Sequence, residues 1–226
     1  MTARRLLDLY CKAGGTSVGY SRAGFEVVGV DIEPQPRYPF EFRQGDALDV
    51  LDALAAGREP WPGSGEFDAI AASPPCQDNS LMQNFGPVDH GTWWLLGQTR
   101  RLLQEIGLPW VIENVPPHAP MRPDYQLCGC MFGLPELRRV RWFETSWRGF
   151  DLRPPCCHVM PAISVVGHGS SSSTRRRLGR SVNKADYTRV MGIEWMTRDE
   201  MAQAVPPPYT EYVGGQLMAE LNAPAA

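Results

Sequence analysis

The sequence predicts an α/β fold built on a doubly wound, mostly parallel sheet with a small irregular region appended to it. Short apolar runs of strand length alternate with helical patterns through the first half of the chain, as expected of successive βαβ units. Polar or glycine-rich turns follow several of these runs, where parallel strands would end at one edge of the sheet. The chain has 226 residues and 43% hydrophobic content, enough for one sizeable core.

The individual elements are predicted from residue pattern. Short apolar runs indicate strands, and segments with helical periodicity indicate helices. Turn residues separate them, most clearly in a stretch rich in proline and glycine at 59–65. The expected strands are 5–10, 25–30, 67–72 and 109–113, with another ending at Asp46, and the expected helices are 16–23, 47–56 and 92–106.

Charge is distributed unevenly along the chain. Between Leu137 and Val190 there are ten arginines, one lysine and three acidic residues, a net charge of +8, which leaves −11 for the rest of a chain whose overall charge is −3. Such a segment suits contact with a polyanion, and a solvated loop kept soluble by its arginines is the alternative. Within it, the low-complexity tract GHGSSSSTRRRLGR (167–180) is expected to be mobile unless bound.

The sequence predicts neither a membrane nor a secretory location. No apolar stretch is long enough to cross a bilayer, and the start MTARRLLDLY lacks the apolar core and cleavage site of a signal peptide. Six cysteines are few for this length, and in a reducing compartment they are expected to be thiols or ligands. We therefore expect a cytoplasmic protein, with a monomer as its expected state.

A glycine turn follows the first expected strand. The segment LDLYCKAGG (7–15) runs from a strand into a helix, an arrangement that lets backbone amides approach a cofactor. Asp31 ends the next expected strand and Asp46 the third, so both carboxylates should lie at the same edge, where a carboxylate can accept hydrogen bonds from ribose hydroxyls. The alternative is that both aspartates only cap helices or turns.

A cysteine and a carboxyl group are expected at this same edge. In SPPCQDNS (73–80), Cys76 follows two prolines whose restricted φ angles would hold its thiol at a fixed place above the sheet. WVIENV (110–115) ends the next strand with Glu113 and Asn114. A fixed thiol near a carboxyl group suits nucleophilic attack on a bound electrophile, whereas an inert, half-buried cysteine is the commoner alternative.

These motifs together resemble a known family. The series LDLYCKAGG, VDIEP, GDALD, SPPCQ, VIENV, RRVRWFE and PPPYTEYVGGQL resembles, in order and spacing, the DNA cytosine-5 methyltransferases, most of all the compact versions of phages and prophages. The resemblance covers nearly the whole chain. It implies a catalytic and cofactor-binding core of the Rossmann-like S-adenosylmethionine-dependent type at 1–145, a reduced target-recognition region at 146–190, and a C-terminal segment at 191–226 that returns to the core.

The resemblance implies a covalent mechanism. Cys76 would add to C6 of a cytosine flipped out of double-stranded DNA, and Glu113 would hold N3 and the exocyclic amino group. Arg139 and Arg141 match the family's arginine pair, which reaches the flipped base, and 77–91 matches the loop that closes over it. The residues expected to contact DNA are Gln77, Ser80, Arg138, Arg175, Arg176 and Arg177.

The resemblance also implies S-adenosylmethionine as the cofactor. Asp31 matches the carboxylate that holds the ribose, Ile32 a position that stacks on adenine, and Asp46 an adenine contact. The C-terminal helix starting near Tyr209 is expected to complete the pocket. The other residues expected to bind the cofactor are Tyr10, Lys12, Ala13, Gly14, Gly15 and Pro74.

Two positions depart from the family pattern. Leu137 replaces the glutamine that heads the arginine motif, which puts the anchoring of the closing loop in question. Lys12 replaces the first glycine of the cofactor turn, next to the methionine part of the ligand. A lysine there would suit carboxy-S-adenosylmethionine, because its ammonium group could pair with the acid and select that cofactor, giving 5-carboxymethylcytosine. The alternative is that Lys12 points to solvent.

Other functions stay open from the sequence. The chain could methylate RNA, since one relative of this fold acts on transfer RNA, or it could rely on a partner for sequence recognition. It could also be an inactive DNA-binding module, although the presence of Cys76, Glu113 and both arginines argues against this.

A further group of cysteines lies outside these motifs. Cys128, Cys130, Cys156, Cys157 and His158 could bind zinc and staple the shortened recognition region. Their CxC and CC spacings differ from the usual CxxC knuckles. The sequence therefore favours cysteines that only pack, and no metal is expected.

Overall fold

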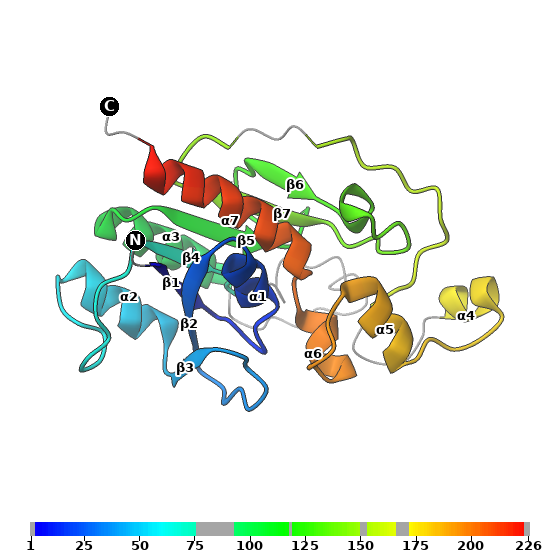
Figure 1. The fold of residues 1–226 in the computed structure, drawn as a ribbon, viewed down its shortest axis with the longest axis horizontal. Helices are drawn as coiled ribbons and strands as arrows, with labels where there is room; N and C mark the ends of the chain where they lie inside the picture. Colours follow the sequence, from blue (N-terminus) through cyan, green and yellow to red (C-terminus); the bar gives the residue numbers. More distant parts are fainter. Residues whose placement is uncertain (1–2, 76–92, 118, 150–152, 166–171, 224–226) are drawn as a thin grey trace.

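A seven-stranded sheet forms the centre of the protein in the computed structural model, which describes residues 3–75, 93–117, 119–149, 153–165 and 172–223. The strand order is β3-β2-β1-β4-β5-β7-β6 (Figure 1). The first five strands pair in parallel, whereas β7 pairs antiparallel with both β5 and β6. The strands are β1 (Arg4–Leu9), β2 (Phe25–Asp31), β3 (Glu41–Gln44), β4 (Ala69–Ala72), β5 (Trp110–Asn114), β6 (Tyr125–Leu127) and β7 (Arg141–Thr145).

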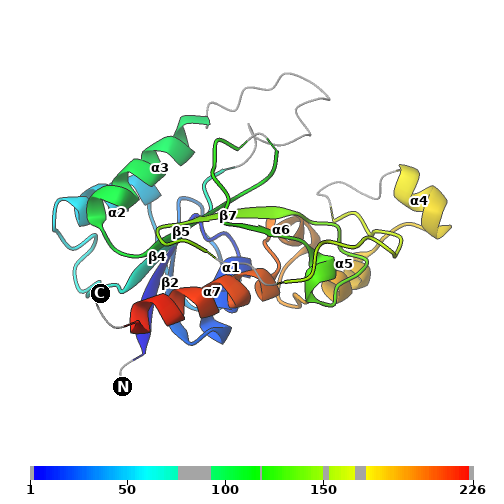
Figure 2. The same ribbon diagram turned by 90° about the horizontal axis from the view of Figure 1, so that it is seen from above.

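Helices cover both faces of this sheet (Figure 2). Two of them, α1 and α7, pack together on one face, and α2 and α3 pack together on the other. Among the described helices, none combines the length and the apolar character needed to span a bilayer. The helices are α1 (Gly15–Arg22), α2 (Ala47–Ala55), α3 (Trp93–Ile106), α4 (Ser172–Leu178), α5 (Lys184–Met191), α6 (Arg198–Gln203), α7 (Pro207–Asn222) and the 3₁₀ turn η3 (Gly129–Phe132).

The apolar runs of the sequence become strands because both faces of the sheet are buried. In β1, Leu7 and Leu9 belong to the core beneath α2 and α3, while Leu6 belongs to the core beneath α1 and α7. All three are fully buried. The sheet therefore needs apolar residues at consecutive positions, which is the pattern that predicted it.

A third, smaller core joins the C-terminal half of the chain to the sheet. Tyr187 and Met191 of α5 and Met201 of α6 pack there with Ala13 and Leu137. Ala13 lies in the glycine turn after β1, and Leu137 precedes the arginine motif. The helices of the C-terminal half are thus packed directly against the predicted cofactor turn, and α5 runs across the boundary expected at 190.

The predicted fold class is confirmed, and the predicted elements all occur with shifts of a few residues at their ends. One assignment was wrong at the third strand, which ends at Gln44 rather than at Asp46. Asp46 is instead the N-cap of α2, where its side chain accepts a hydrogen bond from the backbone N–H of Leu48 at 2.8 Å. An aspartate satisfies an orphan N–H at a helix start better than it continues a strand.

Part of the low-complexity tract forms a helix that the sequence pattern did not predict. The residues from 172 to 178 form α4. The helix is fixed by Thr174, which is fully buried and has its hydroxyl 3.0 Å from that of Ser164, and by Arg177, which donates to the carbonyl of Ala162. Amino-acid composition does not show a buried polar contact of this kind, so the sequence did not predict a helix here.

Candidate active site

The site lies at the carboxyl edge of the sheet, where β1, β2, β4 and β5 end. Parallel register places Leu9 beside both Val30 and Ala72, and Ala72 beside Ile112. The residues that follow these positions therefore meet at one edge, as they do in other open α/β sheets. Most predicted cofactor residues lie in the turn after β1 or at the end of β2, and the predicted catalytic residue Glu113 lies near the end of β5.

The turn after β1 has an unusual backbone. Tyr10 and Lys12 have φ angles of 58° and 44°, and Gly14 has 84°. Only glycine adopts such left-handed angles without strain. A Cβ on Gly15 would lie 2.6 Å from the carbonyl oxygen of Val205, so this position is closed to any other residue. Lys12 thus occupies a conformation suited to the glycine it replaces.

Asp31 organises this turn from the end of β2. Its buried carboxylate accepts hydrogen bonds from the backbone N–H groups of Lys12 and Glu33, each at 3.0 Å. The next residue, Ile32, has a side chain that is 64% exposed, an unusual position for a large apolar residue. An exposed apolar side chain beside a fixed carboxylate fits the predicted adenine and ribose contacts.

The Lys12 side chain has acidic neighbours. Its Nζ lies 2.8 Å from Glu33 Oε2 and 3.8 Å from Asp31 Oδ1, and the side chain is 42% exposed. The ammonium group lowers the pKa of Glu33 through this hydrogen bond. Lys12 therefore neither extends freely into solvent nor presents an uncompensated charge.

Three other predicted cofactor residues have structural partners. The Tyr10 hydroxyl lies 3.0 Å from that of Thr99 in α3, and burial raises the pKa of Tyr10 to about 12. The carbonyl of Ala13 accepts a hydrogen bond from the indole of Trp195 at 2.8 Å. Asp46 is exposed at the start of α2, next to the end of β3.

Glu113 is the most unusual carboxyl group at this edge. It is almost completely buried, and its Oε1 lies 3.0 Å from Nε of Arg141, which is also buried. Burial raises the pKa of Glu113, although Arg141, Arg139 and Ser73 act in the opposite direction. Among the described residues, Oε1 has no aligned hydrogen-bond donor. Arg141 thus contacts this oxygen as an ion-pair partner without forming an aligned hydrogen bond.

Asn114, next to Glu113, fixes the turn that leads to Cys76. Its Nδ2 donates to the carbonyl of Pro74 at 3.0 Å, and both residues are buried. The N–H of Ser73 donates to the carbonyl of Leu9 at 3.1 Å. Two hydrogen bonds thus define the chain path up to residue 75. Cys76, Gln77 and Ser80 themselves, with the rest of the loop 77–91, lie outside the described residues.

The two arginines of the predicted pair have different surroundings. Arg141 pairs with Glu113, with its Nε 3.0 Å from Oε1. Arg139 donates to three backbone carbonyls, those of Val165 at 3.1 Å, Ala202 at 2.5 Å and Ala204 at 3.0 Å. Arg139 therefore also joins α6 and the segment around Val165 to the core.

The remaining predicted DNA contacts lie away from the sheet edge. Arg138 is exposed and donates to the carbonyl of His158 at 3.1 Å. Arg175, Arg176 and Arg177 are exposed on α4, which both ribbon views place at the periphery of the molecule (Figures 1 and 2). The structure thus brings together Glu113, Arg141 and the cofactor turn, and holds the arginines of α4 apart from them.

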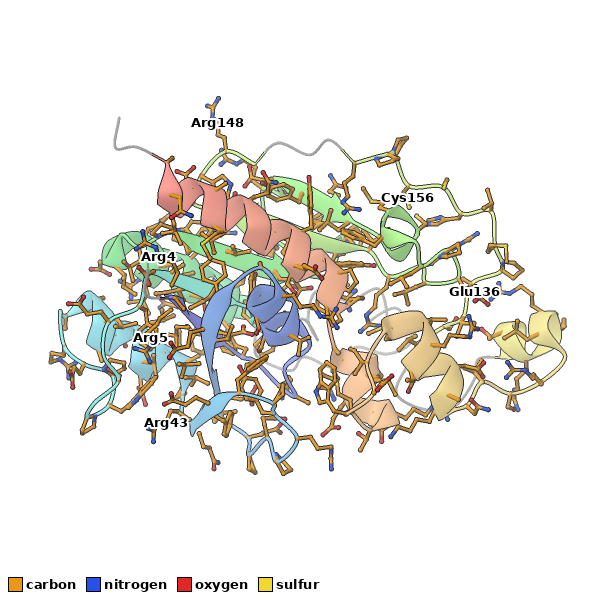
Figure 3. The ribbon with its side chains drawn as sticks, in the orientation of Figure 1. Arg4, Arg5, Arg43, Glu136, Arg148 and Cys156 are labelled. Atoms are coloured by element: carbon orange, nitrogen blue, oxygen red, sulfur yellow. The ribbon has the colours of Figure 1, made fainter. Side chains whose placement is uncertain are left out.

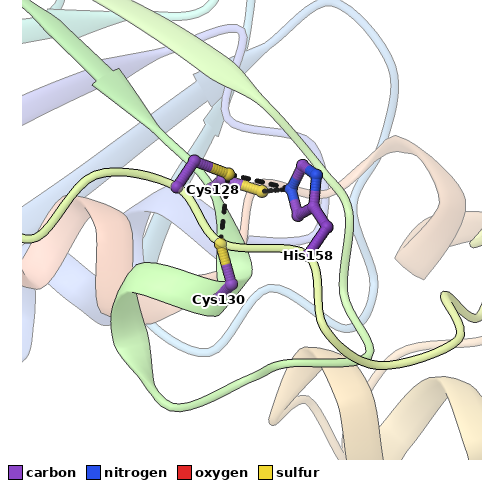
Figure 4. Close-up of side chains that lie close together, drawn as sticks. Cys128, Cys130 and His158 are labelled. Carbon is purple, nitrogen blue, oxygen red and sulfur yellow. Dashed lines mark hydrogen bonds between the residues drawn. The ribbon is translucent and has the colours of Figure 1, made fainter.

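Four of the five candidate metal ligands come together beside the η3 turn. The ligand atoms of Cys128, Cys130, Cys156 and His158 all lie within 4.8 Å of one another (Figure 4). Cys157 is exposed and does not belong to this group. Cys156 lies on the side of the molecule opposite to Arg43 and β3 (Figure 3).

Sequence reasoning missed Asp8, a fully buried carboxyl group next to the last residue of β1. Its Oδ2 accepts hydrogen bonds from the hydroxyls of Thr16 at 2.7 Å and Ser17 at 2.5 Å, which fasten the start of α1 to the strand. Burial raises the pKa of Asp8 to about 6. The signal that could have found it is one acidic residue inside an otherwise apolar strand, LLDL.

The fold and the site together define a class of protein. A parallel sheet extended by an antiparallel strand, with a glycine turn after β1 and a carboxylate after β2, is the Rossmann-like fold of S-adenosylmethionine-dependent methyltransferases. Residues 4–118 match the model of a family described as C-5 cytosine-specific DNA methylase. The match spans just over half of the chain, and the chain belongs to this family.

Solved structures share this fold over nearly the whole chain. A protein assigned as a DNA modification methyltransferase, encoded within a prophage of E. coli, has a TM-score of 0.64 at 16% identity, covering 98% of this chain and 100% of that one. Dnmt2 methyltransferase of S. pombe has a TM-score of 0.61 at 12% identity with the same coverage. At these identities the likeness concerns the fold.

One curated relative matches a shorter stretch. It is assigned as a ribosomal RNA large subunit methyltransferase of Methanocaldococcus jannaschii and is 31% identical over 85 residues. The match covers 31% of this chain and 20% of the relative, so the chain spans only a fifth of that protein's length.

Proposed function

We propose that the protein is a DNA (cytosine-5) methyltransferase that transfers a methyl group from S-adenosylmethionine to C5 of a flipped cytosine through a covalent adduct with Cys76. The observation that carries this proposal is the buried carboxyl group of Glu113, whose Oε1 lacks an aligned donor among the described residues. It lies at the end of β5, and the neighbouring Asn114 holds the turn that leads to Cys76.

The raised pKa of Glu113 suits the recognition of cytosine. Burial favours the protonated carboxyl group, which has one O–H donor and one carbonyl acceptor. Cytosine presents an acceptor at N3 and a donor at its amino group. A protonated Glu113 is complementary to both, and Arg141 lies next to it, where it can stabilise the carboxylate that remains once the proton has moved to N3.

The chemistry then follows from the residues. The thiolate of Cys76 forms a bond to C6, and the electron pair of the C5–C6 double bond moves into the ring, where protonation of N3 by Glu113 limits the build-up of negative charge. C5 becomes nucleophilic and takes up the methyl group, whose bond to the sulfonium sulfur breaks. The C5 proton is lost to solvent, N3 returns its proton to the carboxylate of Glu113, and expulsion of the thiolate restores the double bond.

The residues at the carboxyl edge fit S-adenosylmethionine. The turn with Gly14 and Gly15 lets backbone approach the ligand closely, Asp31 provides a buried carboxylate, and Ile32 an exposed apolar surface. When bound, the cofactor supplies the methyl group on a positively charged sulfonium. Asp31 and Ile32 would hold its adenosine part, with Tyr10, Pro74 and Asp46 lining the same edge.

Double-stranded DNA is the proposed substrate, and RNA is the second candidate. The positive segment between Leu137 and Val190 and the name of the matched family favour DNA. The local match to a protein assigned as a ribosomal RNA methyltransferase favours RNA. We place the protein in the cytoplasm and propose that it acts as a monomer.

The first prediction concerns the product. Purified protein is given S-adenosylmethionine and carboxy-S-adenosylmethionine together, so that the two cofactors compete, with either duplex DNA or RNA as substrate. It should form 5-methylcytosine in DNA. The ammonium group of Lys12 already has Glu33 and Asp31 as neighbours, so we expect no selection of a carboxylated cofactor. Mass spectrometry of the nucleosides checks this.

Variants at the two lysines of the chain make this test specific. Lys12→Gly should keep the cofactor preference, because glycine suits the left-handed backbone and the exposed ion pair contributes at most about 1 kcal/mol. Lys184→Ala, on α5, is the matched control. If the parent forms 5-carboxymethylcytosine and Lys12→Gly does not, methyl transfer is excluded in favour of carboxymethyl transfer. If RNA is modified and DNA is not, RNA is the substrate in place of DNA.

The second prediction concerns α4. Replacing Arg175 and Arg176 with alanine should reduce the slope of log affinity for DNA against log salt by about 1.8, because each phosphate contact contributes about 0.9. Both side chains are exposed. Arg22→Ala is the control, since Arg22 ends α1 at the edge of the sheet away from the site. An unchanged slope in the double variant would show that α4 does not contact phosphates.

A further inference from the structure

We propose that Cys128, Cys130, Cys156 and His158 form a structural zinc site that holds the recognition region against the catalytic core. Their four ligand atoms lie within 4.8 Å of one another (Figure 4). Three thiols and one imidazole are a common ligand set for structural zinc, which is four-coordinate and tetrahedral. The site is separate from the carboxyl edge of the sheet and from every residue given a role in the transfer reaction.

The distances suit a metal better than a disulfide. Cys130 Sγ lies 3.1 Å from Cys156 Sγ, beyond the length of about 2.05 Å of a disulfide bond. Nε2 of His158 lies 2.8 Å from Cys156 Sγ and 3.4 Å from Cys128 Sγ. Tetrahedral zinc with bonds of about 2.1 to 2.3 Å separates its ligands by roughly 3.5 to 3.8 Å, so small side-chain movements would admit the ion.

The local fold brings the first two cysteines onto one side. Cys128 follows β6 and is the N-cap of the η3 turn, which contains Cys130. The residue between them must be glycine, because a Cβ on Gly129 would lie 2.4 Å from the carbonyl oxygen of Leu137. The tight packing of η3 against Leu137 thus permits an unusual CxC spacing, which sequence rules alone did not favour.

The second pair of ligands lies in a segment that has little else to hold it. Residues 154–161 are all exposed and contain no helix or strand, and Val159 is 80% exposed. Anchors exist at its two ends, where Arg153 donates to the carbonyl of Met131 and the N–H of Ile163 donates to that of Glu136. A short segment without a buried apolar face usually needs a cross-link, and zinc would supply one.

The proposed ion would therefore connect two parts of the chain, and an existing hydrogen bond ties them to a third. Cys128 and Cys130 adjoin β6, Cys156 and His158 belong to the recognition region, and the carbonyl of His158 accepts a hydrogen bond from Arg138 of the arginine motif. Because the ligands are gathered only in the folded chain, metal binding would stabilise this arrangement.

The chain offers a matched pair of variants for the test. The full-length protein is purified under reducing conditions without chelator, and its zinc and iron contents are measured by mass spectrometry. We expect one zinc ion per chain in the parent and in Cys157→Ser, and almost none in Cys156→Ser. Cys157 adjoins Cys156 and is equally exposed but lies outside the cluster, so it controls for loss of a surface thiol.

A second measurement keeps the test independent of folding. The parent loaded with cobalt(II) should show the intense visible absorption of a tetrahedral thiolate site, and limited proteolysis should cut Cys156→Ser within 153–165 faster than Cys157→Ser. Absence of metal from the parent, iron in place of zinc, equal zinc in both variants, or a Cys130–Cys156 disulfide under reducing conditions would each overturn the proposal.

Discussion

Replacing Cys76 with alanine is expected to abolish alkyl transfer while leaving cofactor binding nearly unchanged. Without the thiolate, C5 of cytosine is not converted into a nucleophile, and loss of a covalent nucleophile lowers turnover by a factor on the order of 10⁴ or more. The turn after β1, with Gly14 and Gly15, does not involve this side chain. Turnover at saturating cofactor and DNA, with a separate titration of cofactor binding, measures the two effects.

Two comparisons make the result at Cys76 specific. Cys157→Ser, which removes an exposed thiol away from the site, should keep the parent's rate. DNA with 5-fluorocytosine at the target should remain covalently attached to the parent, because the fluorine on C5 cannot be removed as the C5 proton is. The same DNA should not attach to Cys76→Ala. Turnover by the alanine variant near the parent's rate would exclude the covalent mechanism.

The fold was predictable because its core follows one simple rule. Strands buried on both faces read as continuous apolar runs, so β1, β2, β4 and β5 stand out in the sequence. The arrangement of β6 and β7 could not be predicted in this way, because these strands are held by long-range antiparallel pairing. α4 was missed for a related reason, since its anchor, Thr174, depends on a contact with Ser164.

The candidate site was likewise predictable only in part. The positions of Asp31 and Glu113 at strand ends followed from the parallel sheet alone. The state of Glu113 did not, because its raised pKa comes from burial that only the assembled fold creates. The cysteine cluster is the clearest case, because the gathering of its four ligand atoms depends on the packing of Gly129 against Leu137 and on the path of 153–165, which the spacing in the sequence does not show.

Replacing Glu113 with glutamine is expected to reduce turnover about 100-fold or more, with a small effect on the KM for DNA. Glutamine has nearly the same shape and can still face N3 and the amino group, but it cannot give N3 a proton, and general acid catalysis contributes about 10² to 10⁴ in rate. In its ionised form Glu113 pairs with the buried guanidinium of Arg141, and glutamine removes this pairing. The free energy of unfolding should therefore fall, and rates must be compared per folded molecule.

The dependence on pH separates the catalytic role of Glu113 from a structural one. If the protonated form acts, the parent's turnover should fall as pH rises above the raised pKa of Glu113, because the proton needed at N3 is then lost. Glutamine does not titrate, so Glu113→Gln should lack this alkaline fall, whatever the pKa of Cys76. Glu105→Gln, an exposed residue of α3 paired only with Arg101 among the described residues, should keep both the rate and the parent's profile. If the turnover of Glu113→Gln falls at alkaline pH as the parent's does, another group causes that fall. The role of Glu113 is then only to hold the base.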